Sequence, residues 1–405
     1  MKIAFLSPAA GLGGAERCLL DLMVSLRRAA PEISLVLVAG TPGPLLESAR
    51  DAGAEVQILP MPSRLVRAGD SAFSGKAAGR FAAAVRLPGA AWAGLGHARD
   101  LSRLLSRLAP TVVHSNGMKH HVLASLARRG GVPVVWHVRD LVGARPVMAR
   151  ALRLLRTRVA GVLAISEAVR EDVLAALPGV PCERVYDGID LEAFHPAPED
   201  PGLLDALARV PAAPTAVLRV GLVATFARWK GQDLFIEAVA RLAPELRRRA
   251  RFYVVGGPIY DTAGSQFGEA ELRRLAAEAG IAEYVAFVPF QPDPARVFRA
   301  LDVAVHASTR REPFGRTIAE AMACGIPVIA SRGAGATELL DGRQCIQFET
   351  KDAASLAAAL GTVLESRPLR ERLAREGRAL AVARFSRERL GPEVLVAYRK
   401  MGIRA

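Results

Sequence analysis

The sequence is poor in residues that cross-link, stack or hold metals. Its 405 residues include four cysteines, with no Cys-x-x-Cys spacing, and only 5% are aromatic. It contains no Asp-x-Asp motif, and its longest apolar stretches are of strand length. We therefore expect no disulfide framework, no structural zinc, no aromatic platform for nucleic acid and no membrane-spanning helix.

The amino-terminal stretch has some features of a secretion signal. Residues 3–15 are largely apolar, but only Lys2 precedes them, and they end in the glycine-rich run Gly11-Leu-Gly-Gly-Ala-Glu16. That run is typical of a loop between a strand and a helix, not of a leader. We predict no signal peptide, reduced thiols and a cytoplasmic protein.

Positive charge is concentrated in one part of the chain. The formal net charge is +14, and residues 61–160 hold 17 Lys and Arg against three acidic residues, which leaves 37 of each sign elsewhere. Within it, residues 61–96 mix apolar and arginine positions as an interfacial helix pair would. We expect contact with an anionic membrane surface or a lipid-linked phosphate, and we keep a solvated arginine-rich surface as the alternative.

The length and the order of elements predict two domains. A chain of 405 residues with 51% apolar content exceeds one ordinary core, and strand-like Val and Ile runs alternate with helical patterns. We predict an α/β protein with two Rossmann-like parallel sheets. The expected parts are residues 1–195, a proline-rich linker at 196–214, a second domain at 215–385 and a final helix at 386–405.

Three polar residues of the first half follow predicted strands. His114 ends the strand at 111–114 and Asn116 follows it, and His137 ends the strand at 132–137. The carboxyl ends of parallel strands form the edge at which ligands bind. Gly13 and Gly14 begin a helix after the first strand, where backbone amides can approach an anion. His120 and His121 are expected in the solvated first turn of a helix, not as metal ligands.

The richest stretch of the second half is residues 306–330. Glu312 and Glu320 have seven residues between them, and Phe314-Gly315-Arg316-Thr317 marks a helix start suited to phosphate. Arg228 and Lys230 precede another helix, so a guanidinium fork and an ammonium can bind a diphosphate. The alternatives are an exposed turn for the two cations and a purely structural helix-start carboxylate for Glu320.

Taken together, these motifs resemble those of the family 4 glycosyltransferases. The resemblance rests on the Glu312/Glu320 motif, Arg228-Trp-Lys-Gly231, Gly11–Glu16 and Glu338 after Gly333-Ala-Gly335. It implies the GT-B fold, two facing Rossmann-like domains with a cleft, and retaining, metal-independent transfer from a nucleotide sugar. It also implies that the last helix crosses back to the first domain. The chain departs from the family in having Asp187-Gly-Ile-Asp190 and no arginine five or six residues before Lys230.

The resemblance assigns roles to individual residues. Glu312 and His137 would lie near the transferred sugar, Glu320 would hold the ribose, and the cation pair would bind the diphosphate. The expected site residues are: catalytic Glu312, His137, Lys230 and Arg228; donor-binding Glu320, Phe314, Gly315, Arg316, Thr317, Gly13, Gly14 and Glu338; acceptor-binding His114 and Asn116. No metal and no cofactor is expected.

The predicted function is that of a retaining hexosyltransferase. It would move a sugar from a UDP- or GDP-linked donor to a glycan or lipid-linked acceptor, as in polysaccharide biosynthesis at the inner membrane face. Two alternatives use the same fold: a sugar-nucleotide epimerase and a catalytically silent nucleotide-sugar-binding protein. A nucleic-acid binder is suggested only by the charge of residues 61–160, and no recognition motif supports it.

Overall fold

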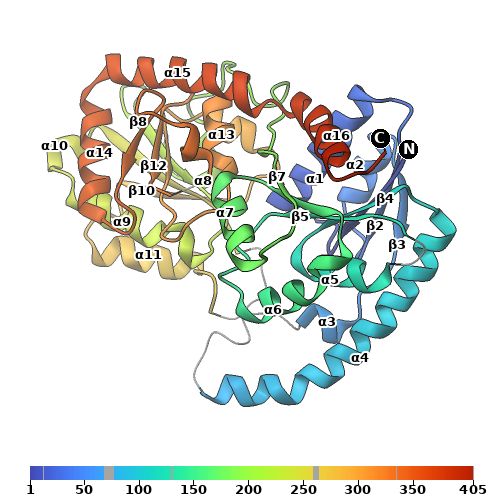
Figure 1. The fold of residues 1–405 in the computed structure, drawn as a ribbon. Coiled ribbons are helices and arrows are strands. Elements are labelled where there is room, and N and C mark those ends of the chain that lie inside the picture. Colours follow the sequence, from blue (N-terminus) through green and yellow to red (C-terminus); the bar gives the residue numbers. More distant parts are fainter. Residues whose placement is uncertain (12, 68–76, 129–130, 259–263, 334, 405) are drawn as a thin grey trace. The chain divides into compact units, whose positions relative to one another are not determined.

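The structure is a computed structural model that describes residues 1–405 except 12, 68–76, 129–130, 259–263, 334 and 405. The described residues form two compact units (Figure 1). The first comprises Met1–Gly188 and Arg387–Ala405, and the second comprises Ile189–Ser386. Each unit is built around one parallel sheet, which confirms the predicted α/β class.

The first unit has a seven-stranded sheet in the order β3-β2-β1-β4-β5-β6-β7. Its strands are β1 Lys2–Ser7, β2 Ser34–Ala39, β3 Glu55–Ile58, β4 Val112–Asn116, β5 Val134–Val138, β6 Gly161–Ala164 and β7 Cys182–Arg184. Its helices are α1 Gly14–Ala29, α2 Leu45–Asp51, α3 Ser63–Arg67, α4 Ala77–Leu108, α5 Met118–Ala127, α6 Pro146–Leu155, α7 Glu167–Ala176 and α16 Leu390–Lys400, with short 3₁₀ turns Arg156–Arg158 and Arg387–Arg389. All residues of β4 and β5 are buried, so helices cover both faces of this sheet.

The second unit has a six-stranded sheet in the order β10-β9-β8-β11-β12-β13. Its strands are β8 Leu218–Val223, β9 Ala250–Gly256, β10 Val285–Pro289, β11 Val303–His306, β12 Val328–Ser331 and β13 Cys345–Phe348. Its helices are α8 Leu203–Ala208, α9 Gln232–Arg241, α10 Pro244–Arg247, α11 Glu269–Glu278, α12 Pro294–Arg299, α13 Arg316–Ala323, α14 Ala353–Glu365 and α15 Arg367–Phe385, with 3₁₀ turns η3 Arg228–Lys230 and η4 Gly335–Leu339. The edge strand β13 was not predicted.

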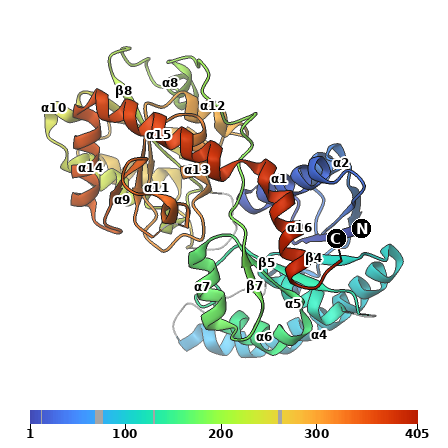
Figure 2. The ribbon, with the colours of Figure 1, turned by 45° about the horizontal axis from the view of Figure 1, so that its top comes forward.

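The last helix packs within the first unit. In Figure 2, α16 lies beside α1, and the amide of Gly391 donates to Ser25 Oγ at 2.8 Å. A Cβ atom at position 391 would lie 2.7 Å from the Ser25 carbonyl oxygen, so glycine permits this close packing. The helix itself begins at Leu390, four residues later than the predicted 386.

The proline-rich stretch 196–214 is not a free linker. It belongs to the second unit and contains α8. Asp205 of α8 is buried, accepts hydrogen bonds from the Tyr253 hydroxyl at 2.7 Å and the Ala213 amide at 2.7 Å, and pairs with Arg251 at 2.8 Å. These bonds attach the stretch to the sheet, which proline content alone does not reveal.

Two further expectations change. His120 and His121 are buried on α5, at 3% and 0% exposure, and are not in a solvated turn, because α4 and α5 pack together. The helix pair expected over 61–96 is α3 and α4, and α4 continues without a break through Pro88. The intervening residues 68–76 lie outside the described part of the chain.

Candidate active site

The second sheet changes its winding direction between β8 and β11. These two strands are neighbours, and the chain continues from β8 toward one edge of the sheet and from β11 toward the other. Ligands of open α/β sheets bind beyond the carboxyl ends of the strands at such a point. The loop after β8 carries Lys230, and the loop after β11 carries Glu312.

Backbone contacts hold the two loops together. The Thr309 amide donates to the Trp229 carbonyl at 2.8 Å. Gly231 has φ +76°, and a Cβ atom there would lie only 2.0 Å from the Ala307 carbonyl oxygen. Because only glycine tolerates both the angle and the approach, Gly231 allows the Lys230 turn to lie against the end of β11.

Glu312 is the centre of a buried polar cluster. Lys230 Nζ lies 2.5 Å from Glu312 Oε1, and the side chains are 16% and 10% exposed. His306 Nε2 lies 2.7 Å from Glu312 Oε2, and the Ser308 hydroxyl donates to the same oxygen. Burial by itself would raise the pKa of Glu312, but Lys230 and His306 outweigh it and hold the pKa below its ordinary value. Glu312 is therefore a carboxylate.

The helix start behind this cluster is built as predicted from its glycine. Gly315 precedes α13 in the left-handed region, with φ +93° and ψ +55°. Phe314 is only 3% exposed and packs edge-on against Phe385 at 5.6 Å between centroids, so its side chain belongs to the core. Glu320, 4% exposed, accepts from Arg316 Nε at 2.6 Å, so two predicted donor-site residues contact each other. Thr317 lies between them on the first turn.

The remaining second-unit candidates are Arg228 and Glu338. The Arg228 guanidinium makes three 3.0 Å contacts with the Glu271 carboxylate and lies 4.4 Å from the Phe267 ring centroid. It is thus held by α11 and not by the Glu312 cluster. Glu338 lies in η4, and the same turn donates the Gly335 amide to the Glu312 carbonyl at 3.0 Å.

The first sheet has its own switch point, between β1 and β4. Gly13 precedes α1 after β1, and Gly14 is the first residue of that helix. Asn116 ends β4 beside them, and its Nδ2 lies 3.5 Å from the Ala15 carbonyl oxygen. Its Oδ1 is buried and has no hydrogen-bond partner among the residues that the structure describes. The predicted residues of this half therefore converge on one edge.

His114 and His137 extend that edge across β4 and β5. His114 Nε2 lies 3.0 Å from His137 Nδ1, and both side chains are at most 3% exposed. Burial, with the nearby Arg139 charge, lowers the pKa of His114 to about 3 and that of His137 well below its ordinary value. Both rings are therefore neutral at physiological pH.

Several residues of these clusters were not predicted. His306 and Ser308 lie at the carboxyl end of β11, so the strand-end rule applied to His114 would also have found them. Arg139 forms an ion pair with Asp187, and the Cys18 thiol lies 3.4 Å from the same carboxylate. Asp187 is the position at which the sequence departs from the family pattern, and no local signal indicates its partner.

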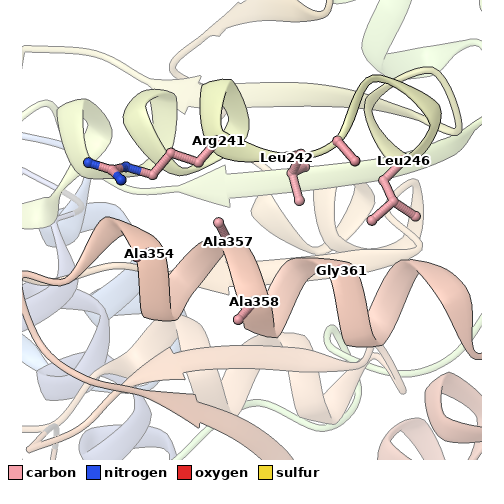
Figure 3. A pocket seen from close by; sticks show the side chains of 8 residues that line it. Arg241, Leu242, Leu246, Ala354, Ala357, Ala358 and Gly361 are labelled. Atoms are coloured by element: carbon pink, nitrogen blue, oxygen red, sulfur yellow. The ribbon is translucent and has the colours of Figure 1, made fainter.

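A hollow elsewhere in the second unit contains none of the predicted residues. Figure 3 shows it between α14 and the segment that joins α9 to α10, with a volume of about 420 Å³. Its lining is mostly apolar and comes from Arg241, Leu242, Ala243, Leu246, Ala354, Ala357, Ala358 and Gly361.

Within the described ranges, no cluster of three or more His, Cys, Asp or Glu side chains could hold a metal ion. No helix in that part of the chain is long and apolar enough to cross a bilayer.

Comparison with known proteins agrees with this arrangement. Residues 208–380 match the family model described as glycosyl transferases group 1, and residues 12–193 match the model described as glycosyltransferase family 4. A D-inositol 3-phosphate glycosyltransferase of Catenulispora acidiphila is 32% identical over 311 residues, covering 71% of this chain and 72% of that protein. The chain belongs to the group 1, family 4 glycosyltransferases.

Further relatives define the range of named activities. A GDP-mannose-dependent alpha-(1-6)-phosphatidylinositol monomannoside mannosyltransferase of Mycolicibacterium smegmatis is 31% identical over 60% of this chain and 64% of its own. The chain spans about half the length of several other curated relatives that it matches. The crystal structure of Anabaena HepE in complex with UDP and glucose has a TM-score of 0.77 at 23% identity, covering 98% of this chain and 99% of that one. This likeness confirms the GT-B fold class.

Proposed function

We propose that the protein transfers a glycosyl group from a UDP- or GDP-linked sugar to a glycan or lipid-linked acceptor. The observation that carries the proposal is the Lys230–Glu312 pair at the switch point of the second sheet, in a chain of this family. A relative named for GDP-mannose and a structural neighbour crystallised with UDP support a nucleotide-sugar donor.

The geometry of the pair suggests how a donor would be held. Lys230 Nζ contacts one carboxylate oxygen of Glu312, Oε1, and lies 4.1 Å from the Trp229 ring centroid. A diphosphate that approaches Lys230 competes with the Glu312 carboxylate for this cation. Binding would therefore release Glu312 toward the sugar hydroxyls, while Lys230 stabilises the charge that grows on the leaving diphosphate. The backbone N–H groups of the first turn of α13, which follows Gly315, form the positive end of the helix dipole and would also favour a phosphate.

Retention of configuration and independence from metal are further parts of the proposal. Lys230 offers a fixed cation where a metal would otherwise balance the diphosphate, and the family resemblance supports same-face attack. The test is the anomeric configuration of the product by NMR, together with turnover in EDTA. An inverted product, or turnover that requires an added divalent ion, would overturn these two points. Product formed without any acceptor would indicate an epimerase.

The positively charged residues 61–160 support an acceptor that is carried by a lipid at a cytoplasmic membrane surface. Among the described residues of this segment, Trp92 on α4 is 74% exposed and Leu154 on α6 is 81% exposed, beside Arg153 and Arg156. Exposed apolar side chains next to arginines suit an anionic interface. Sedimentation with anionic vesicles, and none with neutral vesicles or at high salt, is the expected result. Equal binding to both vesicle types would contradict it.

The central experiment measures donor binding first and transfer activity second. A thermal-shift panel with UDP, GDP and their sugars identifies the donor, since a ligand specific for the folded state raises the melting temperature. Lys230→Ala and Glu312→Ala should then lose transfer activity. Lys400→Ala is the matched control, because Lys400 forms an exposed ion pair with Glu183 at 2.8 Å. Near-wild-type turnover in both site variants would refute the assignment.

A further inference from the structure

A chain of buried hydrogen bonds connects the carboxyl-terminal helix to His137. Tyr398 of α16 has its hydroxyl 2.6 Å from His114 Nδ1, and His114 Nε2 lies 3.0 Å from His137 Nδ1. Tyr398 and His114 are 0% exposed. Three elements of one unit, α16, β4 and β5, thus contribute one side chain each, across 284 positions between His114 and Tyr398.

The second ring nitrogen of His137, Nε2, lies near a cation. Arg139 Nη1 lies 3.5 Å from His137 Nε2, and the same guanidinium forms an ion pair with Asp187, with side chains 9% and 6% exposed. A guanidinium can only donate hydrogen bonds. The contact between Arg139 and His137 is therefore a hydrogen bond only when His137 Nε2 is the unprotonated nitrogen, and the guanidinium charge favours that form.

This constraint determines where the other protons lie. With Nε2 unprotonated, the neutral His137 ring carries its proton on Nδ1 and donates it to His114 Nε2. His114 then carries its own proton on Nδ1 and donates it to the Tyr398 oxygen. The opposite direction would give the buried Tyr398 hydroxyl proton an acceptor in His114 Nδ1, but it would turn an N–H of His137 toward the Arg139 cation. The first direction leaves that hydroxyl proton without an acceptor among the described residues, and the charge of Arg139 outweighs this cost. One orientation of the whole chain is therefore favoured.

We propose that Tyr398 and His114 are positioning residues that hold His137 in its Nδ1–H tautomer. His137 then presents the Nε2 lone pair as an acceptor for a hydroxyl of a bound sugar. Within the described part of the chain, that hydroxyl competes with the 3.5 Å contact from Arg139. The role of His137 toward a sugar rests on the proposed function, whereas its tautomer is a property of the protein alone. The helix that ends the chain thereby takes part in the site.

The Tyr398→Phe variant tests this role directly. It removes the acceptor for the His114 Nδ1 proton, and a buried donor without a partner is costly, so His114 should move that proton to Nε2. His137 must then take the Nε2–H form. We expect the tautomer ratio of His137 to shift by about tenfold or more, as the loss of a buried acceptor implies.

The measurement is the ¹⁵N spectrum of the histidine rings without any substrate, in which the two nitrogens of each tautomer are resolved. Tyr253→Phe is the matched control, since it deletes a buried hydroxyl, bonded to Asp205 at 2.7 Å, in the other unit. The double variant Tyr398→Phe/His114→Gln should restore the Nδ1–H form, because the glutamine amide oxygen can accept from His137. If Tyr398→Phe folds poorly, the tautomer of His137 in the unchanged protein still tests the assignment.

Activity then separates the inference from the proposed function. We expect Tyr398→Phe to lower kcat more than it changes the donor KM, and the double variant to recover part of the loss. An unchanged His137 tautomer in folded Tyr398→Phe, or a wild-type His137 already in the Nε2–H form, would overturn the inference. A shifted tautomer in a protein that neither binds nucleotide sugars nor transfers sugar would refute the proposed function and leave the tautomer assignment standing.

Discussion

The two units place polar residues at the same topological position but give them opposite electrostatic character. In the second unit, the switch point between β8 and β11 holds Lys230 and Glu312, a charged pair with 16% and 10% exposed side chains. In the first unit, the corresponding edge presents His114 and His137 as neutral rings, with the charges of Arg139 and Asp187 paired behind them. A shared fold thus does not dictate shared chemistry.

The difference fits a division of labour in the proposed reaction. A fixed cation stabilises charge that develops on a leaving diphosphate, so the charged edge suits the donor's phosphates. Neutral rings donate and accept hydrogen bonds at little electrostatic cost, so the neutral edge suits sugar hydroxyls. The comparison predicts that substitutions in the second unit reduce transfer activity more than substitutions in the first.

The largest effect is expected from Lys230→Ala. Removing the cation withdraws transition-state stabilisation and leaves Glu312 buried with only neutral donors and His306, so kcat should fall by about 10²–10³-fold. Steady-state transfer rates measure it, with Lys400→Ala as the exposed control. A loss below tenfold, with normal folding, would place the diphosphate elsewhere.

Lowering the pH should reduce the free energy of unfolding of the first unit more than that of the second. His114, His120, His121 and His137 have pKa values lowered by burial from 6.5, the first three to about 3. Lowered histidine pKa values mean that the unfolded state takes up protons first, so stability is complete above pH 6.5 and falls below it. In the second unit, the lowered pKa of Glu312 adds stability that is lost only below 4.5.

We therefore expect the first unit to lose roughly 2–3 kcal/mol between pH 8 and pH 6, while the second unit changes little. Glu16, whose pKa is raised by burial, opposes this trend slightly in the first unit. Hydrogen exchange by mass spectrometry reports the two units through separate peptides. Loss of protection in both units over the same pH range would break the comparison.

The sequence predicted which residues lie at the carboxyl edges of the sheets better than it predicted which side chains contact each other. Strand-end histidines, the glycine before α13 and the two cations were found, because periodicity and turn residues are local signals. The Lys230–Glu312 contact depends on the approach of the Gly231 turn to Ala307, which is tertiary. The same holds for Asp205, whose bonds to Tyr253 and Arg251 turn an apparent linker into part of the second unit.

A smaller effect is expected from His137→Ala in the first unit. The variant removes one neutral hydrogen bond to the sugar, which corresponds to about a tenfold fall in kcat/KM. His195→Ala, which removes a surface ring bonded to the Glu192 carbonyl at 2.8 Å, is the control. Donor and acceptor kinetics measured separately show which substrate loses the bond. A loss as large as that of Lys230→Ala would mean that His137 acts on charge and would remove the proposed contrast.

The smallest effect is expected at Arg228. This cation is bound by Glu271, whereas the nearby Lys230 is bound by Glu312. Arg228 is 45% exposed and already bound by Glu271, so Arg228→Ala should raise the donor KM by only about threefold, the scale of an exposed ion pair. Glu271→Ala frees the guanidinium and should lower the donor KM if Arg228 can turn toward the diphosphate. Arg273→Ala, which breaks an exposed pair with Glu269 on the same helix, is the control for both. If Arg228→Ala proved as damaging as Lys230→Ala, the Glu271 contact would have to open on donor binding, and the two cations would act as one clamp.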